Sequence, residues 1–405
     1  MAGPVRLAIV GGRRGGSFEH ALQAFSDKIA LTAVCDLDEK LLANWKERRP
    51  GIKTTPRFEK LLEFNDVDAV LIATPMQLHA NQAIQALKAG KHVLSEVIAA
   101  CSMDECWELV ETTEKTKLTY MLSENYCYTR EAMMILNMAH QGLFGELTYA
   151  EGAYIHDCRC LMYYPDKTKT WRGEFANSQI ARANGYPTHS LGPVAQWLGI
   201  NRKDKFIRTT TFVTREASRS DYARALLGKD HPDSKPGAWK NSADSASTLI
   251  ETANGVVISL RYDSGSPRPH NMVHYGLQGN RGAYVSARHH AENSLVWIEG
   301  LSKGSGLPGS KQEPEWQNLR DLAEKYEHPR WKEYGEKAKK AGHGGGDFFV
   351  LDDFADAILN KKLPPIDVYD AVTWSCITPL SAQNVRNNGV PAEVPDFLRG
   401  KKRPE

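Results

Sequence analysis

The chain has 405 residues, of which 41% are hydrophobic and 25% are charged, and its formal net charge is +2. This length allows two domains, each with its own core. The near-neutral charge gives no reason to expect nucleic acid or an anionic membrane as a partner. No apolar run approaches the roughly 20 residues that span a bilayer. We therefore expect a soluble globular protein that acts on small molecules.

The first 125 residues alternate β-rich runs with helical patterns. Helices are predicted at Phe18–Phe25, His79–Ala89 and Met103–Lys117, with one more between the second and third strands, and the strands read RLAIVGG, LTAVCD, VDAVLIATP, HVLSEV and LTYMLSE. This alternation predicts βαβ units around a parallel sheet. The nearly continuous apolar strands indicate that helices cover both faces of the sheet. We predict a doubly wound α/β domain at residues 1–125.

From Tyr126 onward the pattern changes. A helix at Arg130–Gln141 is followed by the β-rich segments ELTYAEGAYI, FIRTTTFVT, ASTLIETANG, VVISLRYD and VHYGLQG. Turn residues such as Asn254-Gly255 between such runs indicate antiparallel pairing. We predict an α+β domain at residues 126–405 with a large open, mostly antiparallel sheet.

Three stretches of the second domain are predicted as loops, namely Cys158–Gly185, Arg215–Asp244 and Gly300–Gly346. Polar loops of this length in a compact domain are usually functional or flexible. The tail is predicted to contain a helix through Ile358 and another from Asp367 to Asn387. We expect these C-terminal helices to pack back toward the first domain.

The turn after the first strand reads Gly11-Gly12-Arg13-Arg14-Gly15-Gly16. A G-x-G-x-x-G fingerprint would fall on Gly11, Arg13 and Gly16, so Arg13 departs from it. Glycine at the first position allows a tight turn, and glycine at the third allows close helix–strand packing beside a pyrophosphate. Gly12, Gly15 and Gly16 leave the backbone open to a phosphate. The alternative is a glycine-rich turn without a ligand.

Asp36 ends the second strand, 20 positions after Gly16. An acidic residue there hydrogen-bonds the adenosine ribose hydroxyls of a dinucleotide. Its carboxylate repels a 2′-phosphate, and the neighbouring Leu37 is not the arginine that a phosphate would favour. The pattern therefore favours NAD over NADP. The alternative is a strand-end aspartate that caps the next helix.

A third pattern lies at the carboxyl edge of the predicted sheet. It consists of Ala73-Thr74-Pro75-Met76-Gln77-Leu78-His79, the run ALKAGKHV, and Glu96. It resembles the glucose–fructose oxidoreductase, inositol dehydrogenase and rhizopine-catabolism superfamily (Gfo/Idh/MocA), whose members join a Rossmann domain to an α/β domain with an open sheet. In that superfamily the residue after this glutamate is the lysine of an E-K-P motif. Here it is Val97, which cannot move a proton.

Three clusters stand out in the second domain. In Glu151–Asp157, strand alternation puts Tyr154 and His156 on one face. In GYPTHSLGP, a Pro-initiated helix would place Tyr186 before its first turn and His189 inside it. In SPRPH, a rigid loop ends at His270, which can titrate near neutrality. Such side chains, if held within reach of an acidified C–H, are suited to proton abstraction next to a carbonyl.

These clusters resemble one branch of the superfamily, glycoside hydrolase family 109, which includes α-N-acetylgalactosaminidases with a tightly held NAD. The matching motifs are S-E-V-x-A-A, E-N-x-C-Y, L-N-M-x-x-Q-G-L-F-G-E, E-G-A-Y-I-H-D, Y-P-T-H-S-L-G-P-V-x-Q-W-L, S-P-R-P, G-H-G-G-x-D and V-P-D-F-x-R-G. One departure is His270, where family members often have a tyrosine that contacts the sugar, so the resemblance leaves the sugar open.

The resemblance implies a redox-neutral hydrolysis. A hydride passes from C3 of the sugar to NAD, the ketone acidifies the C2 proton, a base removes it and the glycosidic oxygen leaves. Water then adds and the hydride returns. The resemblance assigns Tyr154 as the C2 base, places His189 near the C3 hydroxyl, and gives His156 and Tyr186 to the sugar site. His343 in GHGGGD is expected either to approach the cofactor or substrate, or to form part of a Gly-rich hinge.

Two sets of site residues are thus predicted. The catalytic set is Tyr154, His156, Tyr186, His189 and His270. The cofactor-binding set is Gly11, Gly12, Arg13, Arg14, Gly15, Asp36, Thr74, Pro75, His79, Glu96, Asn125, Trp171 and Tyr186. No metal site is expected, because the C-x-C pair Cys158 and Cys160 lacks the C-x-x-C spacing of structural zinc sites.

Two other functions stay open: a sugar dehydrogenase of the Gfo/Idh/MocA type in which NAD dissociates, and a non-catalytic sugar- or nucleotide-binding protein. We expect a carbohydrate substrate and a homo-oligomer, a dimer or tetramer, because an uncovered apolar sheet face needs a partner. No signal peptide is visible after Met1. The expected compartment is the cytoplasm, or the periplasm or exterior if a leader has been removed.

Overall fold

The computed structural model describes residues 3–178, 180–269, 271–304 and 311–403, and the chain forms two compact units. The first unit contains Met1–Met133 and His328–Cys376, and the second contains Met134–Glu327 and Ile377–Glu405. The segment His328–Cys376 therefore belongs to the same unit as the N-terminal strands. The boundary that the sequence suggests after residue 125 stays a prediction.

The first unit is built on a six-stranded parallel sheet with the strand order β3-β2-β1-β4-β5-β6. The strands are β1 (Val5–Val10), β2 (Ile29–Cys35), β3 (Lys53–Thr55), β4 (Ala69–Ile72), β5 (His92–Ser95) and β6 (Tyr120–Leu122). Because β4 pairs with the opposite side of β1 from β2, the direction of winding reverses there. Ligands of such sheets bind at the carboxyl ends of the strands near this reversal. The doubly wound fold is confirmed.

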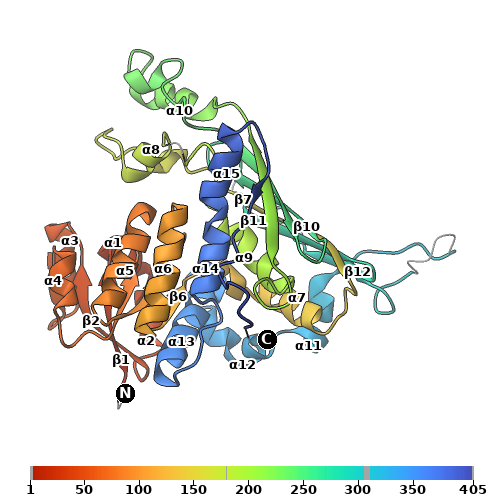
Figure 1. Cartoon of the computed structure of the whole chain (residues 1–405), viewed down its shortest axis with the longest axis horizontal. Helices are drawn as coiled ribbons and strands as arrows, with labels where there is room; N and C mark the ends of the chain where they lie inside the picture. The colour runs from red at the N-terminus through yellow and green to blue at the C-terminus, as the bar shows by residue number, and fades with distance from the viewer. Residues whose placement is uncertain (1–2, 179, 270, 305–310, 404–405) are drawn as a thin grey trace. The chain divides into compact units, whose positions relative to one another are not determined.

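Helices flank this sheet, and α5 and α6 lie side by side (Figure 1). Their bounds are α1 (Gly12–Gly15), α2 (Glu19–Gln23), α3 (Glu39–Arg48), α4 (Phe58–Leu62), α5 (His79–Lys88), α6 (Met103–Thr116), α12 (Pro329–Ala338), α13 (Gly346–Leu359) and α14 (Val368–Ser375). From the C-terminal part, α13 contacts β1 and α2, and α14 contacts β6 and α6. The helix α7 (Arg130–His140) continues from the first unit into the second.

The second unit is built on a nine-stranded sheet with the order β14-β13-β12-β11-β7-β10-β9-β8-β15. The strands are β7 (Leu147–Ile155), β8 (Phe206–Val213), β9 (Ser245–Thr252), β10 (Val257–Asp263), β11 (Asn271–Gly279), β12 (Gly282–Val285), β13 (Leu295–Ile298), β14 (Gln317–Asn318) and β15 (Ala392–Glu393). All adjacent pairs are antiparallel except β7 and β10, which run parallel. The predicted mostly antiparallel sheet is confirmed.

The helices of the second unit are α8 (Trp171–Phe175), α9 (Thr188–Trp197), α10 (Ser218–Leu227), α11 (Ala323–Tyr326) and α15 (Ile377–Arg386). In this unit α9 packs on β7, β10 and β11, and α15 packs on β8. Burial alternates along β9 and β10, so one sheet face is covered and the other carries exposed apolar side chains such as Phe212 and Leu249. The predicted homo-oligomer stays a prediction.

Three sequence-based expectations about helices were wrong. The helical run expected from Phe18 begins at Gly12 and is divided by a 3₁₀ turn at Gly16–Phe18. The helix expected from Asp367 to Asn387 is two helices, α14 and α15, which end and begin on either side of Cys376. The three expected loops also contain helices: α8 lies in Cys158–Gly185, α10 in Arg215–Asp244, and α11 and α12 in Gly300–Gly346.

The composition of α12 explains why its sequence does not look helical. His328 caps its N-terminus by accepting the Arg330 N–H, and Pro329 occupies the first turn, where its missing N–H costs nothing. Only Trp331, Gly335 and Ala338 are buried, at helical spacing. Lysines and glutamates between them make the segment look like a polar loop. None of the helices in the described ranges has the length and apolar character to cross a bilayer.

Candidate functional site

The glycine-rich turn joins β1 to the first helical segment. Gly11 has a φ of 93°, and a β-carbon there would lie 2.5 Å from the carbonyl oxygen of Ala73, so glycine is required. A β-carbon on Gly15 would lie 2.3 Å from Cγ2 of Ile9 in β1. The close helix–strand packing expected of Gly16 is therefore made by Gly15, since a β-carbon on Gly16 would meet only the Trp45 ring at 3.3 Å.

Asp36 directly follows β2 and binds this turn. Its carboxylate accepts the Gly12 N–H at 2.7 Å and the Asp38 N–H at 2.9 Å. A carboxylate has about four acceptor positions, so two more donors can bind. The side chain of Leu37 is 87% exposed and carries no charge. This end of the sheet suits two ribose hydroxyls better than a 2′-phosphate.

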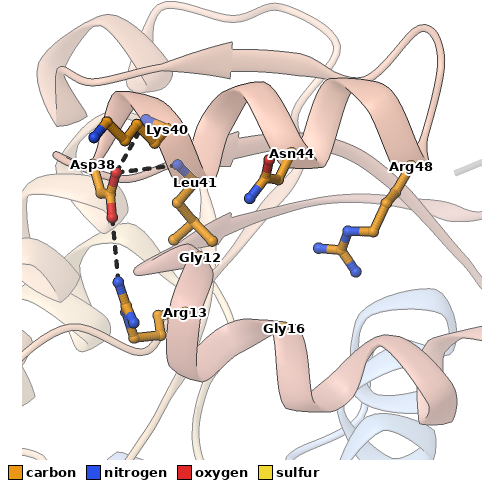
Figure 2. A pocket seen from close by; sticks show the side chains of 8 residues that line it. All are labelled: Gly12, Arg13, Gly16, Asp38, Lys40, Leu41, Asn44 and Arg48. Carbon is orange, nitrogen blue, oxygen red and sulfur yellow. Dashed lines mark hydrogen bonds and ion pairs between the residues drawn. The ribbon is translucent and has the colours of Figure 1, made fainter.

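The two arginines of the turn make different ion pairs. Arg13 pairs with Asp38 at 3.2 Å, and both line a hollow of about 390 Å³ between the turn and α3. Figure 2 shows the two side chains facing each other. Arg14 is 2.5 Å from Glu96, which follows β5 and is buried. Arg14 therefore points along the carboxyl edge of the sheet toward β5, whereas Arg13 points to the residues that follow β2.

The turn after β4 contains Thr74 and Pro75 and leads into α5. Both ring nitrogens of His79 lie 2.8 Å from carbonyl oxygens, those of Thr74 and Ile98. Burial lowers the pKa of His79, because desolvation disfavours the imidazolium. His79 thus ties this turn to the segment after β5. Its direct contact with the cofactor, like that of Thr74 and Pro75, stays a prediction.

Asn125 follows β6 at the same edge and is 1% exposed. Its Nδ2 donates to Asp347 at 2.9 Å, and its Oδ1 is a buried acceptor with no hydrogen-bond partner among the described residues. Most buried polar atoms are hydrogen-bonded, so this acceptor can take a donor from a bound group. Together with the Gly11 turn and the Asp36 carboxylate, it fits a dinucleotide along this edge.

Tyrosine and histidine side chains gather on the covered face of the second sheet. The Tyr154 hydroxyl lies 2.8 Å from Nδ1 of His156. The ring centre of Tyr154 is 5.4 Å from that of Tyr186 and 5.3 Å from that of His189, and Tyr186 and His189 meet edge to face at 5.0 Å. Tyr154 and His189 are buried, while His156 and Tyr186 are partly exposed. Four of the five residues predicted as catalytic are thus adjacent.

Local packing explains this convergence. Tyr186 precedes α9 and His189 lies in its first turn, as the Pro187 signal predicts. A β-carbon on Gly152 of β7 would lie 2.1 Å from the Ser190 carbonyl, so glycine lets α9 approach the strand. The Tyr275 hydroxyl on β11 donates to the His189 carbonyl at 2.5 Å.

Tyr262 also belongs to this cluster, and sequence reasoning missed it. It is the register partner of Tyr154 across the parallel β7–β10 pair, and the two rings stack at 6.3 Å. Burial raises the pKa of Tyr262. The alternation of VVISLRYD could have shown that Tyr262 is inward-facing, but its neighbour follows only from the pairing.

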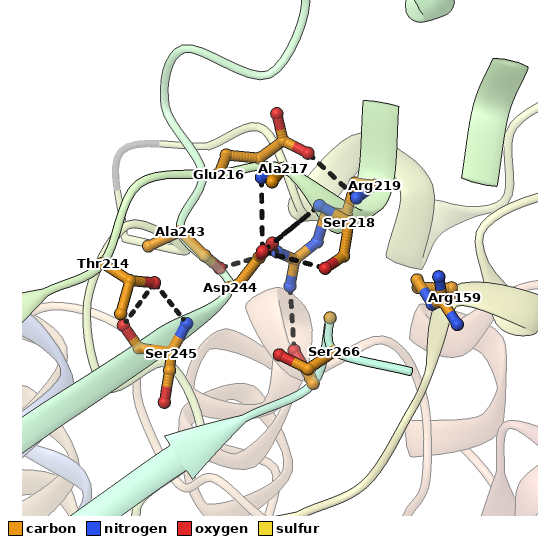
Figure 3. Close-up of polar contacts among 12 residues, drawn as sticks. Arg159, Thr214, Glu216, Ala217, Ser218, Arg219, Ala243, Asp244, Ser245 and Ser266 are labelled. Atoms are coloured by element: carbon orange, nitrogen blue, oxygen red, sulfur yellow. Dashed lines mark hydrogen bonds and ion pairs between the residues drawn. The ribbon is translucent and has the colours of Figure 1, made fainter. Parts of the chain in front are cut away.

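Two predicted site residues remain, Trp171 and His270. Trp171 begins α8, where Arg172 stacks on its ring at 4.4 Å. His270 lies outside the described residues. The loop before it is anchored by the buried Arg219, which donates to the Ser264 hydroxyl at 3.0 Å. Arg219 also donates to the Ala243 carbonyl at 2.6 Å (Figure 3).

Two family models match consecutive parts of the chain. Residues 5–124 match the family model described as "Oxidoreductase family, NAD-binding Rossmann fold", and residues 128–403 match "Glycosyl hydrolase 109, C-terminal domain". The first unit therefore contains an NAD-binding Rossmann domain. A solved levoglucosan dehydrogenase in complex with NADH and L-sorbose has the same fold, with a TM-score of 0.75, 19% identity, and coverage of 97% of this chain and 99% of that one.

Curated relatives extend over nearly the whole chain. A glycosyl hydrolase family 109 protein of Stenotrophomonas maltophilia is 35% identical and covers 98% of this chain and 89% of its own. Another, from Solibacter usitatus, is 36% identical with the same coverage. The protein is an enzyme of the NAD-dependent glycosidase or sugar oxidoreductase type, and its chain belongs to glycosyl hydrolase family 109.

Proposed function

We propose that the protein hydrolyses glycosides by a redox-neutral route, in which C3 of the sugar is oxidised, the C2 proton is removed, the glycosidic bond is eliminated, water adds and C3 is reduced again. The observation that supports this most is the 2.8 Å contact between the Tyr154 hydroxyl and His156 Nδ1, inside an aromatic cluster. A phenol beside an imidazole can lose its proton to the ring and then accept one from carbon.

In this proposal Tyr154 is the base at C2. Its hydroxyl donates to His156 when Nδ1 of the imidazole carries no proton, so His156 can take the phenol proton and return it. The C3 ketone lowers the pKa of the adjacent C2 proton, which brings that proton within reach of a tyrosinate. His189 is assigned to the C3 hydroxyl and Tyr186 to the sugar ring, as the family resemblance implies.

The cofactor would be held by the glycine-rich turn, the Asp36 carboxylate, Arg14 and Asn125 of the first unit. When bound, NAD supplies a hydride acceptor for C3 and later gives the hydride back. Asp36 would accept from the ribose hydroxyls, and backbone N–H groups of the turn would bind the pyrophosphate.

Val97 favours this route over net oxidation. It is 3% exposed and stands where the related dehydrogenases carry the lysine that handles the proton of the oxidised hydroxyl. The sugar ligand of the levoglucosan dehydrogenase complex supports a carbohydrate substrate here. An N-acetylgalactosaminide is the first substrate to test.

The test is a panel of nitrophenyl glycosides, with cofactor absorbance followed during turnover. We expect nitrophenol release without added NAD and without net NADH. Accumulation of NADH with free sugars and no glycoside cleavage would replace this proposal with a sugar dehydrogenase. Bound cofactor with neither activity would replace it with a binding protein.

A matched pair of variants tests the base. Tyr154→Phe is expected to lower glycoside turnover by roughly 10²–10⁴-fold, the usual contribution of a general base. Tyr163→Phe removes a buried hydroxyl that donates to Asp233, outside the aromatic cluster, so its turnover should stay within a few-fold of the parent. A Tyr154→Phe enzyme with parental turnover would remove Tyr154 as the base.

A further inference from the structure

The orientation of the Asn125 side chain is fixed by another buried residue. Asp347, at the start of α13, is fully buried and accepts the Asn125 Nδ2–H at 2.9 Å. An ionised carboxylate only accepts hydrogen bonds. The amide therefore cannot be turned over without losing this bond, and Oδ1 must point away from Asp347. Asp347 thus determines that Asn125 presents an acceptor, and not a donor, on the side of its amide that faces away from Asp347.

His343 holds Asp347 in turn. Nδ1 of His343 lies 3.1 and 3.0 Å from the two carboxylate oxygens. Two glycines permit this arrangement, because a β-carbon on Gly342 would lie 2.3 Å from Asp347 Oδ2, and one on Gly346 would lie 2.3 Å from the Asn125 carbonyl oxygen. The GHGGGD segment is therefore shaped around Asn125, which argues against a simple flexible hinge.

The position of Asn125 along the sheet identifies which part of a dinucleotide it meets. Asp36 follows β2, and Asn125 follows β6, four strand spacings away in the order β3-β2-β1-β4-β5-β6. At about 4.8 Å per spacing the two strands are roughly 19 Å apart. With the adenosine ribose at Asp36, the other end of an extended NAD lies toward β6. The donors at that end are the hydroxyls of the nicotinamide ribose and the N–H groups of the carboxamide, and only the carboxamide is absent from ADP-ribose.

We propose that Asp347 and His343 are positioning residues for the nicotinamide end of NAD, holding Asn125 so that its Oδ1 accepts an N–H of the cofactor's carboxamide. Neither residue touches the cofactor in this role. The inference depends on NAD binding and not on the glycosidase reaction, so it can fail or succeed independently of the proposed function.

The test uses the full-length protein loaded with NADH and displaces the cofactor with ADP-ribose, which lacks nicotinamide, while NADH fluorescence is followed. The displacement gives the ratio of the two dissociation constants. Asp347→Asn, which allows the Asn125 amide to turn over, should weaken NADH roughly tenfold and change ADP-ribose affinity by less than about twofold. His343→Gln should shift the ratio in the same direction by a smaller factor.

Two comparisons separate positioning from damage to the fold. Asp352→Asn on the same helix removes ion pairs to Lys28 and Arg330 and should leave the NADH to ADP-ribose ratio unchanged. Because Asp347 acts through Asn125, adding Asp347→Asn to Asn125→Ala should cause no further loss of NADH selectivity. Equal losses for both ligands, or additive effects in the double variant, would overturn the proposal.

Discussion

The carbonyl oxygen of Ser190 lies 2.1 Å from the point where a β-carbon would stand on Gly152. A strand residue thus contacts the backbone of α9 one residue after His189. We expect Gly152→Ala to push α9 off β7, to destabilise the protein by about 1–3 kcal/mol and to lower glycoside turnover. NADH affinity should fall less than turnover, since the glycine-rich turn, Asp36 and Asn125 belong to the first unit.

Gly276→Ala is the matched control for this substitution. Gly276 also lies in the second sheet, on β11, but an added β-carbon would meet side-chain atoms alone, Cγ and Oε1 of Glu151 at 2.8 Å, and no backbone atom. That side chain can move, so turnover should change little. Equal effects of the two alanines on turnover, measured beside urea unfolding, would count against a specific role for the Gly152–Ser190 contact.

Arg219 is expected to order the loop that leads to His270. It is 5% exposed, and a β-carbon on Gly265 would lie 2.6 Å from its Nη1. Arg219→Met would leave the buried Ala243 carbonyl without this donor, at a cost of roughly 1–3 kcal/mol, and would remove the bond to the partly buried Ser264 hydroxyl. Urea denaturation measures the change. Arg224→Ala on the same helix removes a half-exposed pair with Asp221 and should cost less than about 1 kcal/mol.

The pH dependence of stability should carry a contribution from His343. Its hydrogen bond to Asp347 raises its pKa above the ordinary 6.5, and Glu96 acts in the same direction, against desolvation and the charge of Arg14. Between pH 6.5 and the raised pKa, His343 therefore takes up a proton when the chain folds. The stabilisation by the ion pair is fully present below about pH 6.5 and is lost as pH rises through the folded pKa.

Thermal unfolding of the parent and of His343→Gln across this range tests the sign. The difference in unfolding temperature between the parent and His343→Gln should be largest at acidic pH and should shrink toward alkaline pH. His20→Gln changes an exposed histidine in the same unit and should give a difference that does not follow this curve. An advantage that grows with pH would contradict the direction of the shift.

Cofactor choice should depend on Asp36 together with Leu37. In Asp36→Ser/Leu37→Arg the repelling carboxylate is replaced and a cation is added, so we expect NADPH to gain at least about tenfold over NADH, or roughly 1.4 kcal/mol. Leu37→Arg alone should gain far less, because Asp36 still repels the 2′-phosphate. Fluorescence titration with both reduced cofactors decides this. The double variant should also be less stable, since Asp36 binds Gly12 and Asp38.

Much of this architecture follows from local sequence patterns. The buried strands of the first sheet are apolar runs, and Pro187 predicts the start of the helix that contains His189. Local patterns failed where the answer depends on which face meets which neighbour. The spacing of the glycines does not reveal that Gly15, and not Gly16, faces Ile9. The few buried residues of α12 are too widely spaced to stand out among its charges.

The long-range contacts of the site are the other part that could not be predicted. Asn125 and Asp347 are 222 positions apart, so no motif joins them. Tyr262 becomes a neighbour of Tyr154 only through the parallel pairing of β10 with β7. A parallel pair needs a crossover connection, and here the chain between β7 and β10 includes α9, β8 and β9. Alternation shows which face a residue occupies, but it does not show which strand lies beside it.

The central place of β7 also sets the order in which the protein can be assembled. Its two partners, β10 and β11, are both synthesised after α9, β8 and β9. Until then an apolar strand on the ribosome has two unsatisfied edges, a situation that favours aggregation and slows folding. Tyr154 and His156 are therefore made early, but their surroundings are completed only when the tenth and eleventh strands emerge. A shortened chain that stops before β10 would contain most of the predicted catalytic residues without the sheet that holds them together.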